Sequence, residues 1–93
     1  QFSVHQVVGI IGADGKVERA QVRFVGPVHF GAGVWVGAEL AVPVGKNDGM
    51  VQGTRYFRCE PRHGIFVPCT KERVTAWDAA TVHTLKPSPP SYV

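Results

Sequence analysis

The segment Gly45-Lys46-Asn47-Asp48-Gly49 places three polar side chains in a row between two glycines. Lysine supplies an ammonium group, and asparagine supplies both a hydrogen-bond donor and an acceptor. The glycines allow the chain to turn sharply and bring its backbone close to a ligand. Such a segment favours an anionic ligand with hydrogen-bonding groups. Ordinary surface turns have the same composition, so this segment alone does not identify the ligand.

Aromatic residues lie on both sides of this polar segment. Phe30 and Trp35 precede it, and Tyr56 and Phe57 follow it. A single aromatic residue is more often part of a core than of a contact surface. Several of them on strands beside a cationic loop could form the floor of a groove. The combination suits a peptide that is both acidic and aromatic.

Short β-branched and aromatic runs separated by glycine predict strands, and no window shows helical periodicity. Asp14-Gly15 predicts a hairpin turn, because glycine tolerates a positive φ. A long, turn-rich loop is expected over 41–52. Many short strands around one small core predict an all-β fold, a small barrel or a strongly bent antiparallel sheet with long glycine-rich loops. The predicted strands are 7–11, 17–25, 34–40, 54–59, 64–67 and 74–77.

The second and third predicted strands show which faces are expected to be apolar. Gly26-Pro27 is expected to end the second strand. Within that strand the period of two places Val22 and Phe24 on one face. In the third strand the alternation places Trp35, Gly37 and Glu39 opposite an apolar face, whose residues are Val34, Val36, Ala38 and Leu40.

Composition limits the protein to a few functional classes. The chain has 93 residues, of which 44% are hydrophobic and 18% charged, so it is one domain and too apolar to be disordered. Its formal charge of +3 favours an acidic partner. No apolar run approaches the roughly 20 residues needed to cross a bilayer, so no membrane role is expected. Only two cysteines, Cys59 and Cys69, predict reduced thiols and a cytoplasmic location.

The residues that enzymes and cofactor sites need are not arranged for those tasks. The four histidines are dispersed, so no metal site is expected, and no nucleophile stands at a useful spacing from a base. Gly31-Ala32-Gly33 begins like a dinucleotide-binding motif, but Val36 occupies the position of the third glycine. Gly45-Lys46 lacks the following Ser or Thr of a phosphate-binding loop. We therefore expect no catalytic residues and no cofactor.

Binding of single-stranded nucleic acid is the alternative that physical reasoning leaves open. A small basic barrel with exposed aromatic rings can stack bases. The ten basic residues are scattered from Lys16 to Lys86 and are not interleaved with aromatic residues, which disfavours this reading. A steep loss of oligonucleotide affinity with salt would distinguish it.

Three stretches of the chain resemble the CAP-Gly family, the cytoskeleton-associated protein glycine-rich domains. Phe24 to Leu40, with its Phe-Gly-Ala-Gly-Val-Trp-Val-Gly run, resembles the first half of such a domain. Gly45 to Cys59 is similar to the family signature, and His63 to Val67 resembles its closing strand. The resemblance covers 22–67, about half the chain. It implies an SH3-like, strongly bent antiparallel sheet.

The resemblance also implies a function in the cytoskeleton. It implies recognition of acidic C-terminal tails that end in Glu-Glu-Tyr or Glu-Glu-Phe, as in α-tubulin of microtubules, end-binding proteins and cytoplasmic linker proteins. Lys46 and Asn47 would hold the acidic part of the tail. Phe30, Trp35 and Phe57 would line a groove for its aromatic residue. The full set of expected peptide contacts is Gly45, Lys46, Asn47, Gly49, Phe30, Trp35, Phe57 and Arg55, the last as an additional charge partner.

The sequence departs from the family pattern in three places. Ala20 occupies a position usually held by glycine, and Met50 one usually held by a small hydroxyl residue. After Val67, Pro68-Cys69-Thr70 stands where the family often has a basic residue and a Pro-Ser pair, so contacts from that region are not carried over. The domain is expected to span residues 1–83. Residues 84–93, rich in proline and serine, are expected to form a flexible tail or linker.

Overall fold

The computed structural model describes residues 2–12 and 14–77. Within these residues all the secondary structure is β, and the strands pair antiparallel, which confirms the predicted all-β class. No helix in these two ranges is long and apolar enough to span a membrane. The strands are β1 (Val7–Ile11), β2 (Val17–Val28), β3 (Gly31–Leu40), β4 (Met50–Val51), β5 (Thr54–Arg55), β6 (Gly64–Pro68) and β7 (Val74–Ala76).

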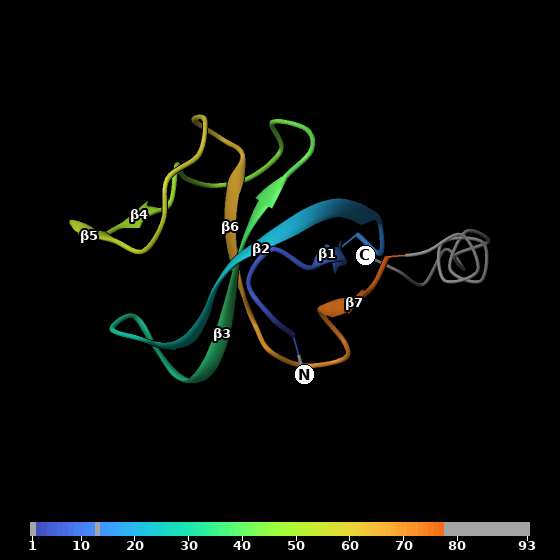
Figure 1. The fold of residues 1–93 in the computed structure, drawn as a ribbon, viewed down its shortest axis with the longest axis horizontal. Helices are drawn as coiled ribbons and strands as arrows, with labels where there is room; N and C mark the ends of the chain where they lie inside the picture. Colours follow the sequence, from blue (N-terminus) through green and yellow to red (C-terminus); the bar gives the residue numbers. More distant parts are fainter. Residues whose placement is uncertain (1, 13, 78–93) are drawn as a thin grey trace.

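One bent sheet contains most of the strands, in the order β6-β3-β2-β1-β7 (Figure 1). The long strands β2 and β3 run through its middle, and β4 and β5 form a separate hairpin to one side. β1 pairs with β2 from Val7 opposite Gln21 to Ile11 opposite Val17 without a break. The second half of β2 therefore projects past β1 as a hairpin with β3, and it reaches toward the side where β4 and β5 lie.

The first hairpin forms at the predicted turn. Gly15 has a φ of 81°, which is the left-handed conformation that glycine adopts without steric cost. The Asp14 carboxylate accepts a hydrogen bond from the Lys16 backbone N–H at 3.0 Å and stabilises the turn.

The core lies on one face of the sheet and consists of small aliphatic side chains. The predicted alternation in β3 is confirmed for Val36, Ala38 and Leu40, which are each at most 2% exposed. Val34, expected on the same buried face, is 52% exposed, because it lies on the part of the hairpin that projects past β1. Ala20, where the family pattern has glycine, adds its methyl group to this core. No polar or charged residue of the described ranges is buried. The core residues are Val8, Ile10, Ala20, Val22, Val36, Ala38, Leu40, Val67 and Val74.

A β-bulge in β2 changes which face Phe24 occupies. Val22 pairs with Ala38 but Phe24 pairs with Gly37, so the register shifts between them. The expectation that Val22 and Phe24 share a face is wrong, because an extra residue in one strand reverses the alternation beyond it. Val25 packs against the core instead, and the Phe24 ring meets aromatic rings on the opposite face.

Several predicted strand ends also differ from the structure: β3 begins at Gly31 and not at residue 34, and β6 and β7 end one residue later and one residue earlier than predicted. β2 passes through Gly26-Pro27 and ends at Val28; Pro27 fits there beside a second irregularity in pairing, a place where strands tolerate proline. β5 ends at Arg55 and does not reach residue 59, because the next two backbone N–H groups both donate to the carbonyl of Gly49. The predicted tail at 84–93 lies outside the described residues.

Candidate functional site

The glycine-rich segment is Gly45 to Gly49, and its last residue bonds to the chain that follows β5. The Gly49 carbonyl accepts hydrogen bonds from the backbone N–H groups of Tyr56 at 2.9 Å and Phe57 at 3.3 Å. Its φ is 98°, and a Cβ placed there would lie 2.0 Å from the Phe57 carbonyl oxygen. Both the backbone conformation and the close approach therefore require glycine at this position.

The start of the same segment is bonded to β6. The Lys46 N–H donates to the Gly64 carbonyl at 2.8 Å, and the Gly64 N–H donates to the Asn47 carbonyl at 2.8 Å. Gly45 lies so close that a Cβ there would be 2.5 Å from the Gly64 oxygen. The segment is thus fixed at both ends by backbone hydrogen bonds, and its side chains are not needed to hold it against β6.

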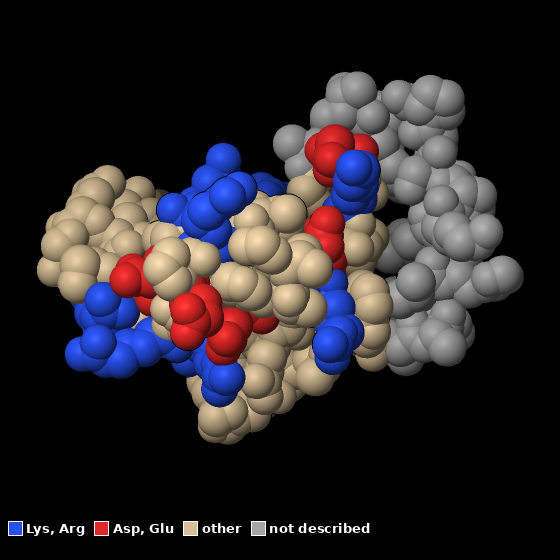
Figure 2. Space-filling view, turned by 90° about the horizontal axis from the view of Figure 1, so that it is seen from above, with Lys and Arg blue, Asp and Glu red and all other residues tan. Residues whose placement is uncertain are grey.

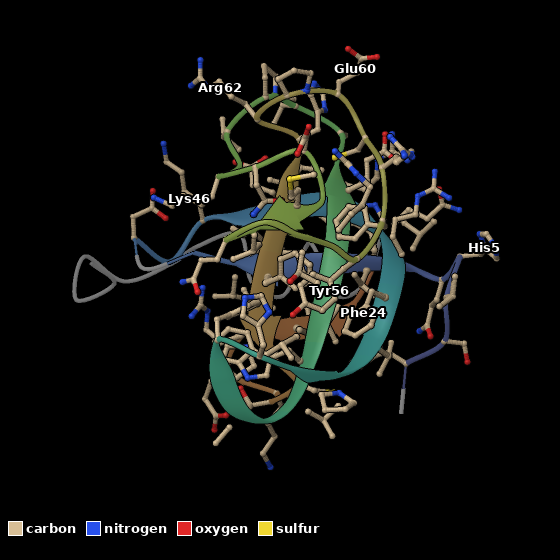
Figure 3. All side chains as sticks on the ribbon, turned by 90° about the vertical axis from the view of Figure 1, so that its left-hand side faces the viewer. His5, Phe24, Lys46, Tyr56, Glu60 and Arg62 are labelled. Atoms are coloured by element: carbon tan, nitrogen blue, oxygen red, sulfur yellow. The ribbon has the colours of Figure 1, made fainter. Side chains whose placement is uncertain are left out.

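Lys46 and Asn47 both keep hydrogen-bond donors that the fold does not use. Asn47 accepts a bond from the Gly49 N–H through Oδ1 at 2.9 Å, which directs its Nδ2 donors elsewhere. Within residues 2–12 and 14–77, no acceptor bonds Nδ2 and no carboxylate pairs with Lys46. Lys46 is exposed and lies at the rim of the face shown in Figure 3, with Tyr56 and Phe24 near its middle.

The Arg55 side chain forms hydrogen bonds within the site itself. Its guanidinium donates to the carbonyls of Asp48 at 3.2 Å and Phe57 at 3.0 Å, and it lies 3.5 Å from the Asp48 carboxylate. Desolvation raises the pKa of Asp48, but the Met50 N–H and the Arg55 charge outweigh it and hold that pKa below its ordinary value. Arg55 was expected as an additional charge partner of the peptide. In the structure its N–H groups stabilise the glycine-rich segment.

Aromatic rings cover the sheet face opposite the core, and we call this set the aromatic surface. The expected Phe30 and Trp35 lie 5.2 Å apart between ring centroids, and Phe57 joins the set through Phe66 at 5.5 Å. All the rings are only partly buried. The members of the aromatic surface are Phe24, Phe30, Trp35, Tyr56, Phe57 and Phe66.

The aromatic surface is brought together by residues that sequence reasoning did not assign to the site. Phe66 is its centre, with centroids 5.1 Å from Tyr56, 5.3 Å from Phe30 and 6.1 Å from Phe24. On either side of Phe66 in β6, Val67 belongs to the core and Ile65 packs against it. The face of Phe66 could therefore have been inferred from the alternation in 64–67. The position of Phe24 depends on the bulge, which no sequence signal marks.

Gly37 on β3 provides the space beneath these rings. A Cβ there would lie 2.7 Å from the Phe66 ring and 2.8 Å from the Phe57 ring. At the hairpin end, the Trp35 Nε1–H donates to the Ala32 carbonyl at 2.9 Å. The indole therefore presents its apolar face, and its one polar donor is satisfied within the hairpin.

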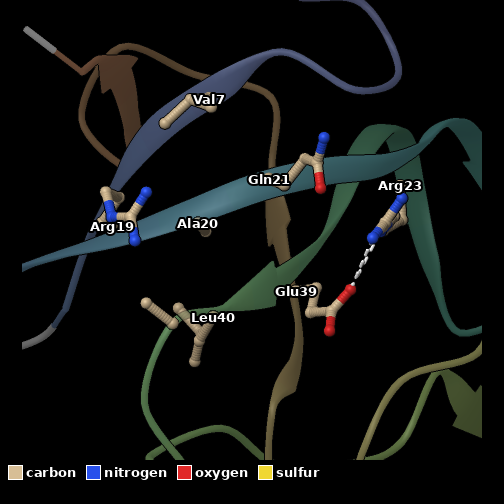
Figure 4. A pocket seen from close by; sticks show the side chains of 8 residues that line it. Val7, Arg19, Ala20, Gln21, Arg23, Glu39 and Leu40 are labelled. Atoms are coloured by element: carbon tan, nitrogen blue, oxygen red, sulfur yellow. Dashed lines mark hydrogen bonds and ion pairs between the residues drawn. The ribbon is translucent and has the colours of Figure 1, made fainter.

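A hollow of about 270 Å³ lies elsewhere, along β2 (Figure 4). Three charged residues line it, and two of them, Arg23 and Glu39, form an ion pair at 2.8 Å; the third is Arg19. On the face seen in Figure 2, basic and acidic side chains alternate and do not form one basic patch. Neither feature offers a strongly charged surface of the kind that a nucleic acid requires.

Comparison with known proteins identifies the family. Residues 4–72 match the CAP-Gly domain, well over half of the chain. This chain belongs to the CAP-Gly family. The predicted resemblance is therefore confirmed, and it extends beyond 22–67 on both sides.

Individual relatives agree with the family assignment. The chain is 44% identical over 84 residues to the Restin homolog of Drosophila melanogaster, and 54% identical over 46 residues to the tubulin-specific chaperone B of Dictyostelium discoideum. These matches cover 90% and 50% of this chain, but only 5% and 17% of the relatives. The chain thus spans a small part of the relatives it matches.

Two solved structures have the same fold. The solution structure of the CAP-Gly domain of the human kinesin-like protein KIF13B is 39% identical, with a TM-score of 0.69 over 85% of this chain and 73% of that one. The Bik1 CAP-Gly domain with an ETF peptide from Bim1 is 32% identical, with a TM-score of 0.56 over 87% of this chain and 83% of that one.

Proposed function

We propose that this CAP-Gly domain is a microtubule-associated binding module that recognises acidic C-terminal tails ending in an aromatic residue. The tails are of the Glu-Glu-Tyr or Glu-Glu-Phe type found on α-tubulin, end-binding proteins and cytoplasmic linker proteins. The domain works in the cytoplasm on the cytoskeleton, and it binds rather than catalyses. The names of the relatives, which include a tubulin-specific chaperone and a kinesin-like protein, support this setting.

The observation that carries the proposal is the junction at Gly49. Its N–H donates to the Asn47 side chain, and its carbonyl accepts from Tyr56 and Phe57. Gly49 therefore lies between the free polar donors of Lys46 and Asn47 on one side and partly exposed aromatic rings on the other. A ligand that carries carboxylates next to an aromatic ring satisfies both sides at once. The ETF peptide bound by the Bik1 domain combines an acidic residue with an aromatic one.

Each part of the site has a role in this proposal. Lys46 and Asn47 donate to the carboxylates of the tail. Phe30, Trp35 and Phe57 pack against its terminal ring together with the rest of the aromatic surface. Gly45 and Gly49 fix the backbone that presents the polar donors, and Arg55 braces that backbone through Asp48, so it acts on the ligand indirectly.

The aromatic contact is what separates this mode from simple charge attraction. Attraction to the +3 charge is screened over roughly 8 Å at physiological salt and barely distinguishes one acidic peptide from another. Aromatic pairs contribute about 0.5–1.5 kcal/mol beyond the area they bury. Recognition therefore requires the carboxylates and the terminal ring together.

A paired titration at 0.15 M salt tests the proposal. We expect a peptide ending in Glu-Glu-Tyr to bind with a dissociation constant of about 1–100 μM, since a short flexible tail loses entropy on binding. Removing only the terminal Tyr should weaken binding at least about tenfold, roughly 1.4 kcal/mol. Equal affinities of the two peptides would contradict the proposed use of the aromatic surface.

A single-stranded oligonucleotide of equal charge is the control for nucleic-acid binding. We expect no saturable binding of it at the concentrations that saturate the peptide. An oligonucleotide that binds more tightly than the peptide, with a steep salt dependence, would replace this proposal by the nucleic-acid alternative.

A further inference from the structure

Tyr56 spans the distance between the two halves of the proposed site. Its backbone N–H is fixed to the Gly49 carbonyl in the glycine-rich segment. Its ring packs edge-on against Phe24 at 5.0 Å and Phe66 at 5.1 Å between centroids. Its hydroxyl lies at the other end, beside the turn between β2 and β3. One side chain thus connects the segment that carries the polar donors with the hairpin that carries Phe30.

His29 holds the hydroxyl of Tyr56 from the hairpin side. The His29 backbone N–H donates to the Tyr56 hydroxyl oxygen at 3.1 Å, and Nδ1 of the His29 ring contacts the same oxygen. The two rings stack with an interplanar angle of 6°. A neutral imidazole with Nδ1 unprotonated accepts the hydroxyl hydrogen, so the hydroxyl donates and accepts at once.

Besides this contact, the tip of the hairpin is held by the ring contacts of Phe30 with Trp35, Tyr56 and Phe66. Val28 pairs with Gly31, which leaves His29 and Phe30 as the two turn residues. β1 pairs with β2 only as far as Gln21, so the hairpin tip receives no support from that strand. The His29–Tyr56 contact is therefore positioned to fix Phe30 against the aromatic surface.

We propose that His29 and Tyr56 form a latch that fixes the β2–β3 turn to the glycine-rich segment, and that His29 is a positioning residue for tail binding. This inference rests on the proposed function, because it names what sets the affinity of that site. A latched turn presents Phe30 and the polar donors in their bound arrangement before the tail arrives. An unlatched turn must lose its freedom on binding, which lowers the affinity.

Amide hydrogen exchange in the free domain tests the latch without any ligand. Tyr56→Phe keeps the ring and removes the hydroxyl, so the His29 amide loses its acceptor. We expect exchange at the His29 amide to accelerate at least about tenfold, while the amides of β1 exchange as before. Unchanged protection at His29 in a folded variant would show that the latch does not exist in solution.

A double-mutant cycle measures what the latch does for binding. We expect His29→Ala and Tyr56→Phe each to weaken the Glu-Glu-Tyr peptide about three- to tenfold, the range of one net hydrogen bond. The two effects should be less than additive in the double variant, since the contact between His29 Nδ1 and the Tyr56 hydroxyl is already lost in either single variant. His29→Asn, whose side-chain oxygen replaces Nδ1 as acceptor, should restore most of the affinity.

The outcomes separate the latch from the proposed function. Wild-type affinity in folded His29→Ala, additive effects in the cycle, or no rescue by Asn would each overturn the positioning role while peptide binding stands. If the wild-type domain binds no Glu-Glu-Tyr peptide, the proposed function fails, and the role of the latch in tail binding fails with it. The positioning role would also be overturned if His29→Ala lowered both the melting temperature and the affinity, while Tyr56→Phe lowered neither.

Discussion

The two faces of the bent sheet are built from different residues and have different exposure. One face carries the core of valine, isoleucine, leucine and alanine, every member at most 3% exposed. The other carries the aromatic surface, whose rings are all partly exposed. Trp35 and Val36, neighbours on β3, show the contrast within one strand: Val36 is fully buried in the core, and Trp35 is partly exposed on the opposite face.

In this small domain, the residues that stabilise the fold and the residues proposed to bind a partner lie on different faces of one sheet. The aliphatic core excludes water and contributes most of the hydrophobic stabilisation. The aromatic surface leaves ring area in contact with water, and a partner that covers these rings is stabilised by burying that area. The glycine-rich segment adds hydrogen-bond donors beside the rings, at a position fixed by backbone hydrogen bonds and braced by Arg55. Substitutions on the two faces should therefore have different effects on stability and on binding.

The largest effect on stability is expected from the core. Leu40→Ala should lower the free energy of unfolding by about 2–5 kcal/mol, because Leu40 is only 2% exposed and its truncation removes packing from the core. Val34→Ala on the same strand is the matched control: Val34 is 52% exposed, and its truncation should cost about 0.5 kcal/mol or less. Urea unfolding measures both. Peptide affinity of the folded fraction should stay unchanged in each, and a large affinity loss in Leu40→Ala would show that the two faces are coupled.

Gly49→Ala tests the junction and should affect both properties. The positive φ alone costs about 1–3 kcal/mol, and the contact of the new methyl group with the Phe57 carbonyl adds to it. Gly53→Ala is the control, since Gly53 has a φ of 84° but no atom near its Cβ position. We expect Gly53→Ala to lose stability and keep peptide affinity. Equal affinities of the two folded variants, measured by calorimetry, would contradict the role of Gly49 in presenting the polar donors.

Lys46→Ala should change binding and leave stability unchanged. A lost charge-assisted hydrogen bond should weaken the Glu-Glu-Tyr peptide by about 1.5–3 kcal/mol. Lys71→Ala removes the same charge from the exposed turn between β6 and β7, which lies away from β4 and β5 (Figure 1). If both variants lose affinity equally, net charge and not a specific contact attracts the tail.

The smallest effect is expected from Asp48 in acid. Its pKa is lower in the folded protein than its ordinary value of 3.8, so the folded state binds the proton less readily than the unfolded chain. The stabilisation from this carboxylate is present above about pH 4 and is lost as the pH falls through the lowered pKa. Asp48→Asn should show a smaller loss of unfolding free energy between pH 5 and about pH 2 than the wild type. Parallel curves in urea denaturation would show that the pair with Arg55 does not stabilise the loop.

The sequence predicted the parts of the fold that depend on local pattern. The alternation from Val36 to Leu40 requires one buried face, and Asp14-Gly15 requires a turn. It also predicted the family, because the glycine-rich segment has a spacing that few other sequences share. Lys46 and Asn47 were located in a polar surface segment for the same reason: a short segment between glycines, rich in polar groups, has no apolar side chain to bury.

The errors concern features set by contacts between distant segments. Thr54 to Cys59 has the composition of a strand, yet it leaves β5 after Arg55 because Tyr56 and Phe57 bond to Gly49. The sequence also does not show that the Arg55 guanidinium donates to the carbonyls of Asp48 and Phe57. No sequence pattern predicts the contact of the Tyr56 hydroxyl with His29, which is 27 positions earlier in the chain.

The sequence by itself determined an all-β domain with an aliphatic core, a glycine-bounded polar segment and enough aromatic residues for a contact surface, because periodicity and glycine spacing are local properties. Only the tertiary structure decided which aromatic residues share that surface. The bulge at Arg23 turned Phe24 away from the core, and the pairing of β3 with β6 placed Phe66 over Gly37. Those positions depend on register between strands, and register follows from the packing of the whole sheet rather than from any one segment.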